Sequence, residues 1–160
     1  MKPIWLLDVD GVLNAVTSKA PAGPGAWKSY VKYKASNGFT LTYSPELIER
    51  MTKLVDEDKV EILWLTTWWD QIEKLPWSQW HNFKVANTPE EYNVFGSWWK
   101  LEVVKRLYNP AQKLVWTDDD ISLDSRSKIW LEDKNILAIS PKTSLGLTPK
   151  YMEMIEDYLG

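Results

Sequence analysis

Short apolar runs recur along the chain, and each one ends at a polar or turn residue. They cover residues 4–7, 60–65, 114–117 and 136–139. Runs of four to six apolar residues bounded by polar turns are typical of strands buried in a parallel sheet. The pattern therefore predicts four central strands.

Helical patterns alternate with these runs. Apolar residues recur at helical spacing in 45–55, 97–107, 123–132 and 148–159. The first of these helices follows Ser44 and Pro45, a capping residue and a proline suited to the first helical turn. Strands that alternate with helices predict a three-layer α/β fold with a Rossmann-like parallel sheet covered on both faces. The chain shows no repeat or long linker, so we expect residues 1–160 to form a single domain.

Residues 14–43 interrupt this alternation. After a loop rich in proline and glycine, two alternating segments, 27–33 and 39–43, flank the pair Asn37-Gly38. An Asn-Gly pair between alternating segments is a strong hairpin signal. We therefore expect a β-hairpin after the first strand.

The hairpin region differs in charge from the rest of the chain. Residues 11–45 carry four lysines and no acid, whereas the whole chain has a net charge of −3. Its first strand would turn Trp27, Val31 and Tyr33 to one face. Lys28, Tyr30, Lys32 and Lys34 would point to the other. A basic surface with aromatic rings is how single-stranded nucleic acid is held. An amphipathic hairpin that packs its apolar face on the core explains the same pattern, and the sequence leaves both interpretations open.

Composition excludes several classes of site. The chain has no cysteine, which excludes a disulfide-linked partner, a Cys-ligated zinc site and a thiol nucleophile. Its one histidine, His81, leaves no zinc-binding pair and is expected to be structural. The densest apolar run, 62–69, is too short to span a bilayer, and the first residues lack a signal-peptide pattern. We expect a cytoplasmic protein with no membrane partner; the oligomeric state cannot be predicted.

Acidic residues follow two of the predicted strands. Ligands of open α/β sheets bind at the carboxyl ends of the strands. The strand ends here read Asp8-Val9-Asp10-Gly11, Thr66-Thr67 and Asp118-Asp119-Asp120. Carboxylates that converge at one edge repel each other unless a cation lies among them, and oxygen ligands favour a hard ion such as Mg²⁺. The sequence therefore predicts a magnesium site.

The order of these residues resembles a known family. An Asp-x-Asp-Gly-Val-Leu motif that begins at Asp8, then Thr66, then Lys100 at a helix start, then the pair Asp118-Asp119, is similar to the haloacid dehalogenase (HAD) superfamily of phosphotransferases. The segments 65–68, 99–100, 115–121 and 140–148 further resemble a small capless branch associated with RNA-repair enzymes.

The resemblance implies a division of catalytic roles. Asp8 would attack phosphorus to form an aspartyl-phosphate, and Asp10 would protonate the leaving oxygen and then activate water. Thr66 would hydrogen-bond the phosphoryl oxygens, and Lys100 would offset their charge. An acid at Asp10 is the feature of family members that hydrolyse phosphate esters.

The resemblance also implies how Mg²⁺ would be held. The ligands would be Asp8, the backbone carbonyl of Asp10 and a carboxylate of the pair Asp118-Asp119, with Asp119 preferred as the direct ligand. Asp124 could orient the water shell.

The two windows where such proteins carry a cap domain, 14–43 and 70–99, hold only 30 residues each. This predicts a capless enzyme with the hairpin as a flap, open to a bulky phosphorylated substrate such as a nucleotide or a nucleic-acid end. The expected substrate-binding residues are Thr67, Lys28, Lys32, Trp68, Trp69 and Trp98.

Of the 11 tryptophans, those inside predicted strands are expected in the core. Two alternatives stay open: a non-catalytic phosphate- or nucleic-acid-binding protein, and a phosphatase for small metabolites.

Overall fold

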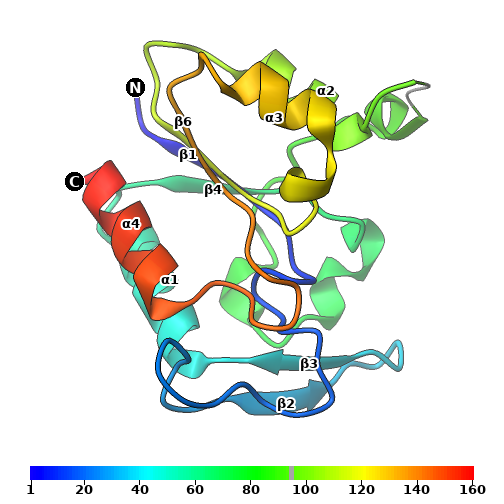
Figure 1. The fold of residues 1–160 in the computed structure, drawn as a ribbon. Helices are drawn as coiled ribbons and strands as arrows, with labels where there is room; N and C mark the ends of the chain where they lie inside the picture. The colour runs from blue at the N-terminus through cyan, green and yellow to red at the C-terminus, as the bar shows by residue number, and fades with distance from the viewer. Residues whose placement is uncertain (94–95) are drawn as a thin grey trace.

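Four parallel strands form the central sheet of the computed structural model, which describes residues 1–93 and 96–160 (Figure 1). The strands are β1 (Ile4–Leu7), β4 (Glu61–Trp64), β5 (Leu114–Thr117) and β6 (Ile136–Ile139), in the order β4-β1-β5-β6. Leu7, the last residue of β1, pairs with the last residues of both neighbours. The carboxyl ends of β1, β4 and β5 therefore lie side by side at the same edge of the sheet. The four predicted strands are confirmed, and the second is shorter than the run 60–65.

Helices cover both faces of this sheet. On one face, α1 (Pro45–Asp56) and α4 (Pro149–Leu159) pack on Trp5 and Leu7. On the other, α2 (Trp99–Leu107) and α3 (Ser125–Leu131) pack on Leu6 and Trp116 (Figure 1). Successive residues of a strand point to opposite faces, so β1 alone supplies apolar side chains to both cores. The three-layer α/β prediction is confirmed.

The helix starts differ in detail from the prediction. Ser44 precedes α1 in extended conformation, but its hydroxyl makes no capping bond. The second helix begins two residues later than Ser97, whose hydroxyl donates to Glu102 inside the helix instead. α4 has a side-chain cap in Thr148, which accepts a hydrogen bond from the backbone of Tyr151.

The hairpin forms as a separate two-stranded sheet of β2 (Val31–Lys34) and β3 (Thr40–Tyr43). Figure 1 shows it beyond the carboxyl ends of the central strands. The first strand begins at Val31 and not at Trp27, which corrects the prediction. Trp27 precedes the strand, is buried, and donates its indole N–H to the carbonyl of Leu147 over 2.7 Å, whereas Val31 is exposed. Within the strand, Tyr33 is the residue of the expected apolar face that packs against the core, where it is partly buried.

The second insertion contains short 3₁₀ segments, Trp69–Lys74, Ser78–Trp80 and Pro89–Asn93. Trp80 is fully buried there, as are Trp5, Trp64 and Trp116 in the strands, so the core role predicted for the strand tryptophans is confirmed. His81 donates its Nε2–H to the carbonyl of Leu75 over 2.8 Å, a structural contact. In 1–93 and 96–160, no helix combines the length and the apolar character needed to cross a membrane.

Candidate active site

Three carboxylates meet where β1 and β5 end. Asp8 follows β1 and Asp118 and Asp119 follow β5, and one oxygen of each lies within 4.8 Å of the others. Asp8 and Asp118 are buried, and Asp119 is half-buried. Burial, followed by the charge of Asp8, raises the pKa of the Asp118 carboxyl to about 8. Burial also raises the pKa of Asp119 above its usual value. The cluster therefore favours a proton or a cation among its oxygens.

Lys100 supplies one positive charge to this cluster. It lies in the first turn of α2 and is only 4% exposed. Its Nζ lies 3.0 Å from Asp8 Oδ2 and 2.5 Å from Asp118 Oδ2. Burial opposes the charge, but the two carboxylates together raise the pKa of Lys100 above its usual value, so the ammonium stays charged. One ammonium between three carboxylates still leaves net negative charge at the sheet edge.

The donor set fits a hard divalent cation. Asp118 is already engaged, because one of its oxygens accepts from Lys100 and the other from the backbone N–H of Asp120 over 2.9 Å. In the described part of the chain only Thr143 donates to the Asp119 carboxylate, to Oδ2 over 2.7 Å. Asp119 thus keeps an oxygen that can bind a metal, which supports its choice as the direct ligand beside Asp8.

Gly11 makes room for Asp119. Its φ of +76° is a left-handed conformation, and a Cβ at this position would lie 2.2 Å from Asp119 Oδ2. Both the backbone conformation and the close carboxylate exclude a side chain here. The glycine of the Asp-x-Asp-Gly motif is therefore part of the geometry of the site.

Asp10 is held apart from the three-carboxylate cluster by two N–H donors. Its Oδ1 accepts from Asn14 Nδ2 over 2.9 Å, and its Oδ2 accepts from Trp68 Nε1 over 3.1 Å. Asn14 is itself fixed, because its Oδ1 accepts from the backbone N–H of Thr42 in β3 over 2.7 Å. The hairpin therefore holds the Asp10 side chain through Asn14.

The two threonines after β4 have different environments. Thr66 is buried, and its hydroxyl accepts from the backbone N–H of Trp68 over 3.3 Å. Thr67 is exposed and lines a pocket of about 120 Å³ next to Asp10.

The tryptophans expected to stack on a base are largely packed. Trp68 is only 6% exposed, so the structure gives no support to stacking and shows instead that it fixes Asp10. Trp98 is half-buried, with its ring centroid 5.5 Å from that of Trp116. Trp69 is half-buried against Tyr92, at 4.1 Å between centroids.

The lysines of the hairpin do not line the pocket beside Asp10. Lys28 is exposed on the segment before β2. Lys32 is exposed as well, and its Nζ donates to the carbonyl of Ser18 over 2.7 Å. Asp124, expected near the water shell, caps α3 by accepting from the backbone N–H of Ser127 over 2.9 Å.

The structure adds residues that sequence reasoning did not select. Asn14 and Thr143 hold Asp10 and Asp119, and Asn37, Phe39 and Gln71 line the small pocket. The Asn-Gly turn signal placed Asn37 and Phe39 at a hairpin tip. Nothing in the sequence indicated which part of the protein the tip would contact.

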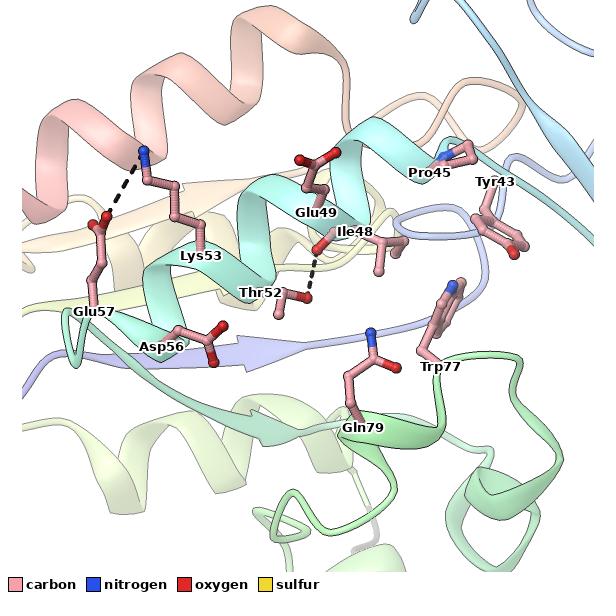
Figure 2. Close-up of a pocket in the computed structure, with 10 residues that line it drawn as sticks. All are labelled: Tyr43, Pro45, Ile48, Glu49, Thr52, Lys53, Asp56, Glu57, Trp77 and Gln79. Atoms are coloured by element: carbon pink, nitrogen blue, oxygen red, sulfur yellow. Dashed lines mark hydrogen bonds and ion pairs between the residues drawn. The ribbon is translucent and has the colours of Figure 1, made fainter.

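A larger cavity, of about 690 Å³, lies away from the carboxylate cluster (Figure 2). It lies between α1 and the segment that carries Trp77 and Gln79, and contains none of the predicted site residues. Glu49, Asp56 and Glu57 line it against one lysine. These carboxylates would repel a phosphate ester, so the cavity does not compete with the strand ends as a phosphate site.

Comparison with known proteins agrees with the geometry. The family described as "HAD domain in Swiss Army Knife RNA repair proteins" matches residues 4–151, which include every charged residue of the cluster. Searches of curated proteins and of solved structures gave no match. A HAD domain supports hydrolase activity of the phosphatase type on a phosphorylated substrate, and HAD proteins generally use Mg²⁺. The resemblance found in the sequence is confirmed: the chain belongs to the family of HAD domains in Swiss Army Knife RNA repair proteins.

Proposed function

We propose that the chain is a Mg²⁺-dependent phosphomonoester hydrolase that acts on a nucleotide or polynucleotide end through an aspartyl-phosphate. The observation that carries this proposal is the buried Lys100 ammonium, 3.0 Å from Asp8 and 2.5 Å from Asp118. A charged, oriented group of this kind is what phosphoryl transfer requires, because that reaction depends on positioning and electrostatics.

The first step uses Asp8 and Asp10. An oxygen of Asp8 attacks phosphorus and forms an O–P bond, while the bond from phosphorus to the leaving oxygen breaks. That oxygen takes the proton of Asp10 and departs as an alcohol. The backbone N–H of Val9, which donates to Asp8 Oδ1 over 2.8 Å, and Lys100 at Oδ2 fix the orientation of the attacking carboxylate.

The second step returns the enzyme to its starting state. Asp10, now a carboxylate, takes a proton from water as the water oxygen attacks the phosphoryl group. The bond between phosphorus and Asp8 then breaks, which releases phosphate and restores the Asp8 carboxylate. Asn14 and Trp68 keep the Asp10 side chain in one orientation for both proton transfers.

Mg²⁺ would be held by Asp8, Asp119 and the backbone carbonyl of Asp10, where it would offset charge on the phosphoryl oxygens. Asp118 would contribute indirectly, because its oxygens already bind Lys100 and a backbone N–H. Thr66 would donate its hydroxyl to a phosphoryl oxygen.

The preference for a nucleic-acid end rests on the openness of the site and on the family. Both insertions contain only the hairpin and short 3₁₀ segments in the described residues, which leaves space for a bulky substrate. The matched family consists of domains from RNA repair proteins.

The test is phosphate release from 3′- and 5′-phosphorylated oligonucleotides, mononucleotides and sugar phosphates, with Mg²⁺ and with chelator. We expect turnover that requires Mg²⁺ and that is lost in Asp8→Asn, whose amide has nearly the same shape but cannot attack. Folded protein without turnover on any ester would refute the enzymatic proposal. Tight oligonucleotide binding insensitive to chelator, without phosphate release, would instead indicate a binding protein.

A further inference from the structure

A small pocket borders Asp10 at the tip of the hairpin. Its volume is about 120 Å³, and it is lined by Asp10, Asn37, Phe39, Thr67, Trp68 and Gln71. Pockets that enclose a whole drug-sized ligand measure about 300–1,000 Å³. This pocket therefore has room for one part of a substrate.

Its position next to Asp10 identifies that part. This inference rests on the proposed function, in which Asp10 protonates the leaving oxygen. A general acid must lie within hydrogen-bond reach of the atom it protonates. The leaving group therefore extends from the phosphoryl site past Asp10, where the pocket begins.

The lining selects a neutral, planar group. Apart from Asp10, the described residues of the pocket wall carry no charge, so a second phosphate or a carboxylate would find no cation there. Asn37 and Gln71 offer amides. Phe39 is 65% exposed, with its ring centroid 5.8 Å from that of the buried Trp68, so it offers a free aromatic face.

The hairpin tip is held in place before any ligand binds. The side chain of Asn37 donates to Gln71 Oε1 over 3.3 Å and accepts from the backbone N–H of Phe39 over 3.2 Å. The carbonyl of Phe39 accepts from the backbone N–H of Ala35, which is buried in the core. A preformed wall of this kind reduces the entropic cost of binding.

We propose that this pocket binds the nucleobase next to the scissile phosphate, with Phe39 as the stacking residue and Asn37 and Gln71 as hydrogen-bonding partners of the base edge. Aromatic stacking accepts every base, because each has a π-face. Specificity for a nucleoside leaving group thus comes from the neutral hairpin tip, and not from the exposed Lys28 and Lys32.

The experiment compares kcat/KM for a nucleoside monophosphate, a phosphorylated oligonucleotide and glycerol phosphate, whose leaving group is aliphatic. We expect Phe39→Ala to lower the ratio of nucleotide to glycerol phosphate by about fivefold or more, mainly through KM, and Phe39→Tyr to restore it. The matched control is Val31→Ala, an exposed apolar residue of the same hairpin outside the pocket, which should leave the ratio unchanged.

A binding measurement separates this inference from the proposed catalysis. The affinity of the same nucleotide and oligonucleotide is measured for Asp8→Asn with and without Phe39→Ala, and we expect the second change to raise Kd about tenfold. An increase in Kd limited to the oligonucleotide would indicate that the pocket binds polynucleotide ends. An equal increase for both ligands would indicate that it accepts any nucleotide. If Phe39→Ala lowered kcat/KM equally for all three esters, or left Kd unchanged, the inference would be overturned. A wild-type protein that releases no phosphate would refute the catalytic proposal, and the binding comparison would still decide the pocket.

Discussion

Replacing Lys100 by methionine tests the electrostatic balance of the site most directly. Methionine has a similar length and a similar helix propensity, so the change mainly removes the ammonium. In the wild type this group lies within 3.0 Å of Asp8 and 2.5 Å of Asp118 and is almost fully buried. Removing one partner of a buried ion pair costs about 3–5 kcal/mol, because the remaining charge has no compensation. We expect a loss of this size in the metal-free protein.

The loss of unfolding free energy in Lys100→Met should depend on pH in a defined direction. The Asp118 carboxyl already has a folded-state pKa of about 8, against 3.8 as its ordinary value. An acid whose pKa is raised by folding holds a proton that the unfolded chain releases, so stability falls as pH rises from about 4 to about 8. Removing Lys100 raises the carboxyl pKa values further. The free energy lost by Lys100→Met should therefore grow as pH rises above about 8, where the wild-type Asp118 carboxyl is ionised and that of the variant is still protonated.

The measurement is urea unfolding followed by tryptophan fluorescence, in chelator and in Mg²⁺. The matched control is Lys105→Met on the same helix, where the lysine is exposed and its Nζ lies 3.4 Å from Glu102. Exposed pairs contribute about 0–1 kcal/mol. Mg²⁺ should recover part of the loss in Lys100→Met, since a cation can replace the missing charge. A loss no larger than that of the control, or one independent of pH and Mg²⁺, would refute the reasoning.

Three further predictions concern the neighbours of the cluster. Asn14→Asp keeps the acceptor for the backbone of the hairpin but places a second acid against Asp10, which disfavours two negative charges there, so the alkaline limb of the kcat/KM profile should move to higher pH; an unmoved limb would contradict the assigned contact. Gly11→Ala should cost about 1–2 kcal/mol from the left-handed backbone and should weaken Mg²⁺-dependent thermal stabilisation by displacing Asp119, and an unchanged midpoint in a Mg²⁺ titration would argue against Asp119 as a ligand. In the wild type, chelator should lower the melting temperature more at pH 8 than at pH 5, because carboxylates such as Asp118 are protonated at the lower pH and need no cation; an equal shift at both pH values would count against the metal site.

Interactions that are local in sequence were predictable. The apolar runs and their polar ends located the strands within one residue, and with them Asp8, Thr66 and Asp118 at one sheet edge. Parallel strands in register bring their carboxyl ends together, so the chemistry at that edge follows from strand order alone. The position of Lys100 was also predictable, because it lies in the first turn of a helix that follows the strand.

The roles of the aromatic residues could not be predicted from the sequence. Trp68 was expected to stack on a base, yet it lies in the core and donates to Asp10. Phe39, which was not selected, presents the exposed ring beside the site. Both outcomes depend on how a hairpin docks against a segment about 30 residues away, and the spacing of apolar residues within each segment carries no information about that contact.

The sequence by itself determined the layers of this protein and the carboxylates at its sheet edge, because strand and helix periods and turn residues act over a few neighbouring positions. Only the tertiary structure decided that Asn14 and Trp68 hold Asp10, that Asp119 requires Gly11, and that the hairpin tip offers a neutral pocket. These features arise from side chains that meet across long stretches of chain. Their directions are set by the packing of whole elements, because a close-packed interior leaves each side chain few possible rotamers.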